Sequence, residues 1–124
     1  MFNKKESKVE ANFDKFDTLI GDNTILEGNL TAKGSIRLDG EVKGIINIEG
    51  HLLVGEKASV IGDINTNSLI VSGMVKGNIK AESFVRITAN GKVIGDISSK
   101  TLVIDEDAFF EGNCKMQALN PVTE

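Results

Sequence analysis

The hydrophobic residues of this chain alternate with other residues in a pattern that repeats about every 17 positions. The first half of each repeat reads apolar-x-Gly-x-apolar, and the second half holds two apolar residues separated by one residue, such as Ile36 and Leu38. Alternation with a period of two is typical of β-strands, and the Val, Ile and Thr that dominate here favour strands. The pattern therefore predicts short strands joined by turns, and no helix. The central glycines of the six copies are Gly28, Gly44, Gly62, Gly77, Gly95 and Gly112.

A parallel coil accounts for this repeat better than a meander of hairpins. Successive glycines are 16, 18, 15, 18 and 17 residues apart, and strong two-residue hairpin turns are scarce. In a coil, each repeat forms one rung, and equivalent residues of adjacent rungs lie about 4.8 Å apart in columns. Three sides per rung suit this period, and crossovers between parallel strands are overwhelmingly right-handed. The sequence therefore predicts an all-β fold, a right-handed parallel β-helix (β-solenoid) of triangular cross-section with about six rungs.

One outward column, the position after each glycine, is mostly Asn or Asp. In its last four members Asp and Asn alternate, so no two carboxylates face each other in adjacent rungs. We interpret the column as a structural amide ladder rather than a metal-binding row, because no spacing creates a closed set of oxygen ligands. Its members are Asn29, Ile45, Asp63, Asn78, Asp96 and Asn113.

Composition and charge argue against several classes of function. The chain has 124 residues and a formal net charge of −4, whereas nucleic-acid-binding domains are usually basic. Its only cysteine, Cys114, occupies a core position of the last repeat, which predicts a small buried hydrophobe rather than a nucleophile or ligand. Its only histidine, His51, has no Ser, Cys or acid at a recognisable catalytic spacing. We therefore expect no catalytic residue, no metal site and no cofactor, and hence no enzyme.

Three stretches, in this order along the chain, carry a resemblance to a known family. They are TLIGDNTILEG from Thr18 to Gly28, the VKGNI and VIGDI motifs, and AFFEGNCKM from Ala108 to Met116. Together they resemble bactofilins, the bacterial polymer-forming cytoskeletal proteins, over Thr18 to Met116. The resemblance implies a right-handed triangular β-helix that assembles end to end, without nucleotide, into non-polar filaments. It also implies scaffolding of membrane or cell-wall machinery. In VKGII, Ile45 replaces the usual polar residue at an outward position, which leaves the fold prediction unchanged.

The two ends of the coil differ from its middle at the outward position just before each motif. The middle rungs have Glu41, Ser59, Met74 and Lys92 there, whereas the first has Ile25 and the last has Phe109. Solenoids normally cap their terminal rungs, and no capping helix is evident. We therefore predict a polymerisation interface at the two ends. The interface comprises Leu19, Ile20 and Ile25 at one end and Phe109 and Phe110 at the other. The alternative is that Phe109 packs under the C-terminal tail.

The start of the chain predicts a membrane contact. We divide the chain into a flexible N-terminal tail (1–17), the β-helix domain (18–116) and a short C-terminal tail (117–124). Basic residues beside a bulky apolar side chain suit an anionic lipid surface, and a filament would multiply weak contacts. The Met-Phe-x-Lys start also resembles the membrane-targeting peptide of many bactofilins, while a disordered solubilising segment is the alternative. The predicted membrane-binding residues are Met1, Phe2, Lys4, Lys5 and Lys8.

These expectations combine into one functional hypothesis. We expect a bacterial cytoskeletal scaffold whose filaments lie at the inner face of the cytoplasmic membrane and position cell-wall or cell-shape machinery. Its partners would be itself, an anionic membrane surface and client proteins such as cell-wall enzymes, with no nucleic acid bound directly. Outward-facing Ile45, Ile61 and Ile94 would form a weak apolar strip for lateral contacts or docking, or would pack against the tails. The alternatives are a non-polymerising β-solenoid binding module or adaptor and, more remotely, a hexapeptide-type acyltransferase, which needs a strict six-residue period.

Overall fold

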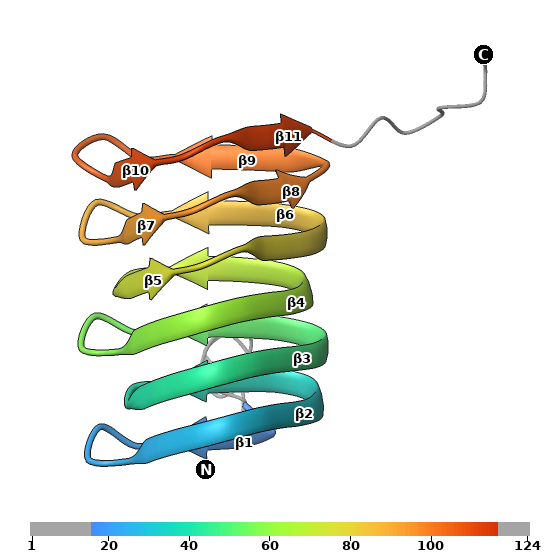
Figure 1. Ribbon diagram of the computed structural model, residues 1–124, viewed down its shortest axis with the longest axis vertical. Coiled ribbons are helices and arrows are strands. Elements are labelled where there is room, and N and C mark those ends of the chain that lie inside the picture. The colour runs from blue at the N-terminus through green and yellow to red at the C-terminus, as the bar shows by residue number, and fades with distance from the viewer. Residues whose placement is uncertain (1–15, 117–124) are drawn as a thin grey trace, which may run out of the picture.

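In a computed structural model, which describes residues 16–116, the chain forms a coil of parallel strands stacked along one axis (Figure 1). All strand pairs in this part of the chain are parallel and join rungs that are neighbours in the sequence. The predicted all-β parallel solenoid of about six rungs is thus confirmed, while its handedness and triangular section stay predictions. The strands are β1 (Thr18–Ile20), β2 (Ile25–Leu38), β3 (Glu41–Val54), β4 (Ser59–Val71), β5 (Met74–Lys76), β6 (Ile79–Ile87), β7 (Lys92–Ile94), β8 (Ile97–Ser99), β9 (Thr101–Ile104), β10 (Phe109–Glu111) and β11 (Cys114–Met116).

The glycines of the repeat stack directly on one another. Gly28 pairs with Gly44, and Gly44 pairs with Gly62. From Gly44 onward each has a φ between 141° and 145°, a conformation that side chains rarely adopt. A Cβ on any of these five would also collide with the carbonyl oxygen of the glycine one rung earlier. Both the backbone conformation and the close approach of adjacent rungs therefore require glycine in this column.

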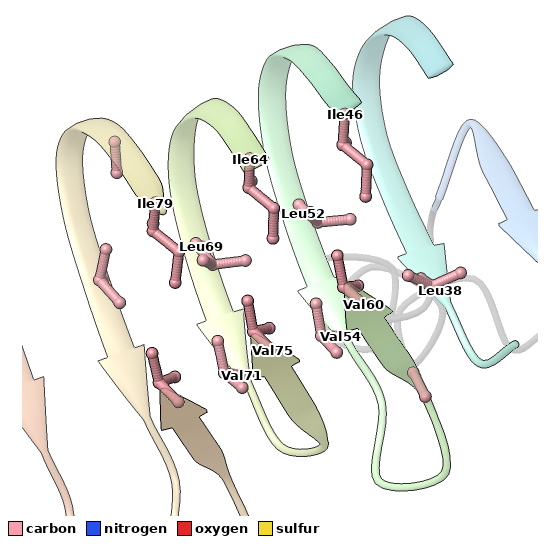
Figure 2. Packing of buried hydrophobic residues seen from close by; sticks show 14 of the residues in the cluster. Leu38, Ile46, Leu52, Val54, Val60, Ile64, Leu69, Val71, Val75 and Ile79 are labelled. Atoms are coloured by element: carbon pink, nitrogen blue, oxygen red, sulfur yellow. The ribbon is translucent and has the colours of Figure 1, made fainter. Parts of the chain in front are cut away.

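Columns of aliphatic side chains fill the interior of the coil. Figure 2 shows Ile46, Ile64 and Ile79 in successive rungs, with their side chains following one another along the axis. Burying one such side chain fully stabilises the fold by roughly 1.5–3 kcal/mol. The core is therefore a stack of like residues, each of which needs a neighbouring rung to cover it. Its other fully buried members include Val42, Val60, Val75, Val93, Leu52, Leu69, Val85, Val54, Val71 and Ile87.

Two bends of variable length explain why the glycine spacing is uneven. The loop between rungs has four residues at 21–24, 55–58, 88–91 and 105–108, but two at 39–40 and 72–73. The register also shifts where β4 pairs with β3 and with β6, because the bend at Thr66–Ser68 is one residue shorter than its neighbours. There the Thr66 hydroxyl lies 2.9 Å from the carbonyl of Gly50 in the preceding rung and 3.2 Å from that of Ser68, and the Ser99 hydroxyl donates to the carbonyl of Thr101 (2.9 Å). When both bends are short, successive glycines are 15 residues apart. The longer form of the bend at Thr66–Ser68 adds one residue and the four-residue loop adds two, which gives the spacings of 16, 17 and 18.

Candidate polymerisation surfaces at the ends of the coil

The N-terminal end exposes apolar side chains and an unpaired strand. Only Ile36–Leu38 of β2 pairs with β1, so the first part of β2, from Ile25 to Gly34, has no earlier strand beside it among the described residues. Leu19 is 63% exposed and Ile25 is 64% exposed, while Ile20 packs partly buried against the core. Nothing lies within 4 Å of the Cβ position of Gly28, although every later glycine of its column is covered by the preceding rung.

One residue covers a small part of this end. The backbone N–H of Asp17 donates to the carbonyl of Ser35 (2.7 Å), and the N–H of Ser35 donates to Asp17 Oδ2 (2.9 Å). The Asp17 carboxylate also lies where a Cβ on Gly34 would be, and Gly34 has a positive φ of 95°. Asp17 thus caps one bend of the first rung and leaves the strand before Gly28 open, a local cap that sequence reasoning missed.

The C-terminal end is also apolar and open. No strand of the described chain lies beyond β9, β10 and β11, and Phe109 is 45% exposed with Lys92 Nζ 5.2 Å from its ring centroid. Phe110 packs partly buried against the core. Val103, Ile104 and Met116 are exposed at the same end, and none of them was predicted to lie at the interface. Ile104 continues the buried column of Ile87, so its position as the last member of that column was the available signal.

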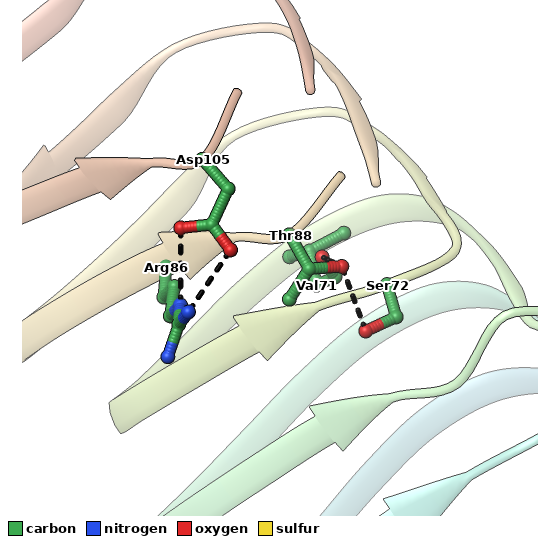
Figure 3. Close-up of polar contacts among 5 residues, drawn as sticks. All are labelled: Val71, Ser72, Arg86, Thr88 and Asp105. Carbon is green, nitrogen blue, oxygen red and sulfur yellow. Dashed lines mark hydrogen bonds and ion pairs between the residues drawn. The ribbon is translucent and has the colours of Figure 1, made fainter. Parts of the chain in front are cut away.

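Polar contacts hold the last rungs in place. Arg86 Nε and Nη2 donate to the two carboxylate oxygens of Asp105 at 3.2 and 3.0 Å, and this raises the pKa of Arg86 (Figure 3). The Thr88 hydroxyl lies 3.0 Å from the Ser72 hydroxyl and 3.3 Å from the carbonyl of Val71. These contacts join adjacent rungs on the loop side, and the Arg86–Asp105 pair reaches the final rung.

Cys114 corrects one sequence prediction. It pairs in register with Ile97, as its core position predicted, yet its side chain is exposed, with Sγ 3.6 Å from the sulfur of Met116. The buried column ends there, and no further described rung covers the thiol. Partial burial nevertheless raises the pKa of the Cys114 thiol. The prediction of a buried hydrophobe was therefore right about register and wrong about burial.

On one side of the coil, the predicted column of Asn and Asp residues contacts adjacent rungs through its carboxylates, and not as a ladder of paired amides. Asp63 Oδ1 accepts the backbone N–H of Asn78 at 3.3 Å, and Asp96 Oδ1 accepts that of Asn113 at the same distance. These contacts turn the carboxylates toward the next rung. Within residues 16–116, no group of three or more His, Cys, Asp or Glu side chains could hold a metal ion. His51 is exposed within β3.

The three outward isoleucines do not form a single strip. Ile45 is 41% exposed and Ile61 is 42% exposed, but Ile45 pairs with Asp63, whereas Ile61 pairs with Lys43. They therefore belong to two columns on opposite sides of the glycines, and Ile94, which is half-buried, belongs to the column of Ile61. The predicted membrane-binding residues Met1, Phe2, Lys4, Lys5 and Lys8 lie outside the described residues. Across the described part of the chain, no helix could span a membrane.

The fold places this chain in the class of parallel β-solenoids with apolar terminal rungs, and the comparisons with known proteins identify a family within that class. The family model described as "Bactofilin: Polymer-forming cytoskeletal" matches residues 18–115. The chain also resembles a solved structure titled as a cryo-EM reconstruction of Thermus thermophilus bactofilin double helical filaments. That match has a TM-score of 0.77 and 31% sequence identity, and it covers 81% of this chain and 99% of that chain. No curated protein matches the chain.

The chain therefore belongs to the bactofilin family of polymer-forming cytoskeletal proteins. This is a family of structural proteins, in keeping with the expectation of a filament component.

Proposed function

We propose that this protein polymerises end to end, without nucleotide, into filaments at the inner face of the cytoplasmic membrane, where it positions cell-wall or cell-shape machinery. The observation that carries the proposal is the apolar surface at both ends of a coil whose core columns are fully buried in the middle rungs. Membership of a polymer-forming cytoskeletal family supports it independently.

The physical argument for end-to-end assembly rests on what the terminal rungs lack. Their strands have free N–H and C=O groups along one side, a strong template for pairing with another chain. Their core columns end in residues such as Leu30 and Ile104, which another rung would cover. Stacking would also cover the side of Ile25 and Phe109 that faces away from their own molecule. Full burial of one core side chain is worth roughly 1.5–3 kcal/mol.

The membrane and client parts of the proposal rest on the chain outside the coil and on its sides. Phe2 and the lysines at positions 4, 5 and 8 suit the surface of an anionic bilayer. Each basic residue near such a surface contributes about 1 kcal/mol, so one tail binds weakly and a filament with many tails binds firmly. Clients would recognise the tails or the outward columns.

Substitution at the C-terminal end tests assembly. We expect Phe109→Arg to abolish filaments in sedimentation and negative-stain microscopy, because a charge would enter the joint between subunits. The matched control is Ile45→Arg, at a side chain of nearly equal exposure in the second rung, which should leave end-to-end filaments intact. If Phe109→Arg sediments like the parent, Phe109 does not lie at the joint.

Deletion of residues 1–8 tests the membrane part separately. Filaments should form as before, and co-sedimentation with anionic liposomes should fall sharply. Equal lipid binding by the shortened chain would show that the tail is not the anchor.

A further inference from the structure

A degenerate copy of the glycine motif precedes the six regular copies. Residues 9–13 read Val-Glu-Ala-Asn-Phe, which is the apolar-x-Gly-x-apolar pattern with Ala11 in place of glycine. Ala11 lies 17 positions before Gly28, and the six regular glycines are 15 to 18 positions apart. Terminal repeats of solenoids are often atypical in sequence and serve as caps. This copy lies outside the described residues, so its register is inferred from that of Asp17.

Asp17 is in register with the end of the open strand of β2. Thr18 pairs with Ile36, so Asp17 occupies the column of Ser35, to whose carbonyl its backbone N–H donates at 2.7 Å. In the short form of the bend before this column, four positions separate the column from the apolar residue after the glycine, as from Ile64 to Ser68. Counting four positions back from Asp17 reaches the last residue of the degenerate copy. The resulting pairs are Phe13 with Leu30, Ala11 with Gly28 and Val9 with Leu26.

The strand that these residues would cover is open. Residues 25–34 of β2 have no earlier strand beside them among the described residues, and Leu26 and Leu30 are only partly buried against the core. Val9 and Phe13 would add one apolar member to each of these two core columns. An open strand edge also favours pairing through its free N–H and C=O groups. The degenerate copy thus matches this edge in both its register and its apolar positions.

The first place in the glycine column is the one where alanine can be accommodated. At Gly44 and every later glycine of the column, a Cβ would collide with the carbonyl oxygen of the glycine one rung earlier. Gly28 has nothing within 4 Å of its Cβ position, and Ala11 would likewise have no rung before it. Ala11 would therefore bear only the strain of a positive φ, such as the 123° of Gly28.

Three features keep the additional rung weak. Its alanine lacks the conformational freedom of glycine. Glu10 would lie beside Glu27, and like charges in adjacent rungs are unfavourable. Lys15 takes the position of Thr66 and Ser99, whose hydroxyls contact carbonyls at the other short bends. We therefore expect this rung to open far more readily than the rungs of the middle.

The described structure shows the arrangement without this cap. Phe16 is half-buried and lines a hollow of about 340 Å³ with Leu19, Arg37 and Asp39, on the side of the coil that follows the open strand. Asp17 can keep its register in both arrangements. Capping therefore requires a change of direction at residue 16 and no rearrangement of the coil.

We propose that residues 9–16 form a weak seventh rung that covers the open strand of β2 and competes with a second subunit for the N-terminal end of the coil. The inference rests on the proposed end-to-end assembly, because a stacked subunit would need the same strand edge and the same apolar columns. The two cannot occupy this end together. Capping therefore raises the protein concentration at which filaments form, in proportion to the loss of open ends.

The first test measures the critical concentration for assembly of the full chain, by sedimentation without lipid. Ala11→Gly restores the glycine and should favour capping by about tenfold. For a cap formed about half of the time, the critical concentration should then rise about fivefold, whereas Phe13→Asp should remove the cap and lower it about twofold. The matched controls are Ser7→Gly and Phe2→Asp, which lie outside the degenerate copy and should leave the critical concentration unchanged.

Hydrogen exchange detects the cap without assembly. The chain carries both Leu19→Arg and Phe109→Arg, which are expected to keep it unassembled. Amides of residues 25–34 that point toward the open end should exchange about twofold more slowly in this chain than after addition of Phe13→Asp. Addition of Ala11→Gly instead should slow them to about a tenth of the uncapped rate. Amides of the middle rungs should exchange equally in all three chains, which shows that the coil is intact.

The two readouts separate this inference from the proposed function. Equal critical concentrations for Ala11→Gly, Phe13→Asp and their controls would overturn the inference, and so would equal exchange of residues 25–34 in the three blocked chains. A higher critical concentration for Phe13→Asp would also overturn it, because the segment would then contribute to the joint between subunits. If the parent chain forms no filaments, the proposed function fails, and the exchange of residues 25–34 still decides whether the seventh rung forms.

Discussion

The middle and terminal rungs of this coil share one pattern but differ in what covers it. In the middle, Ile64 is fully buried between rungs, and Gly62 lies against the carbonyl of Gly44. At the ends, the same columns finish in Leu30 and Cys114, which are not fully buried, and Gly28 has open space at its Cβ position. The ends therefore expose apolar surface for two reasons. Core columns stop without a cover, and outward positions change from mostly polar residues to Ile25 and Phe109.

The largest expected difference concerns the glycine column. Gly62→Ala should destabilise the coil by about 3–5 kcal/mol, because it combines a strained φ with a backbone collision. Gly28→Ala should cost about 1–2 kcal/mol, since only the strain applies. Urea unfolding measures both in a background with both ends blocked, Leu19→Arg combined with Phe109→Arg, which is expected to be unassembled. Equal costs would contradict the difference between covered and open glycines.

The next largest difference is expected between two substitutions in one core column, one in a middle rung and one in the first rung. Ile64→Ala should destabilise the protein by about 3–4 kcal/mol, because the cavity would be closed on all sides. Leu30→Ala, in the first rung of the same column, should cost about 1 kcal/mol in unassembled protein, because that side chain is only partly buried. The same unfolding assay applies. If Leu30→Ala is as costly as Ile64→Ala, the first rung is covered by something other than a second subunit.

The smallest expected effect is a difference in thiol reactivity at the C-terminal end. Burial raises the pKa of Cys114 and so lowers the thiolate fraction, and alkylation should be slower than for a free cysteine at pH 8. The rate should increase as the pH rises above the ordinary thiol pKa. In filaments Cys114 should be protected further, because the next subunit would cover the last rung. Equal alkylation rates in filaments and in the Phe109→Arg variant would contradict burial of this end.

Much of the fold could be predicted from the sequence because strand alternation determines which residues share a side. The six glycine motifs align in the structure as the repeat predicted. The reason for the uneven spacing could not be predicted, because it depends on two bends whose lengths vary independently. At one of them the Thr66 hydroxyl contacts the carbonyls of Gly50 and Ser68, which no periodicity reveals.

The ends were predicted less completely than the middle. Ile25 and Phe109 were found because they break an outward column. Ile104 and Cys114 were missed because they obey an inward column, and alternation tells which way a side chain points but not whether another rung covers it. The hydrogen bonds between Asp17 and Ser35 join residues 18 positions apart in the sequence. Asp17 lies outside the six copies of the repeat, so the repeat pattern does not predict this contact.

The axial spacing of subunits in a filament tests the central claim most directly. Six rungs at about 4.8 Å give a rod of about 29 Å, so end-to-end stacking predicts an axial rise of about 29 Å per subunit along each strand of the filament. Cryo-EM power spectra or fibre diffraction should show this rise together with a meridional reflection near 4.8 Å. Filaments in which the coil axis lies across the filament axis, or monodisperse particles at high protein concentration, would contradict the account.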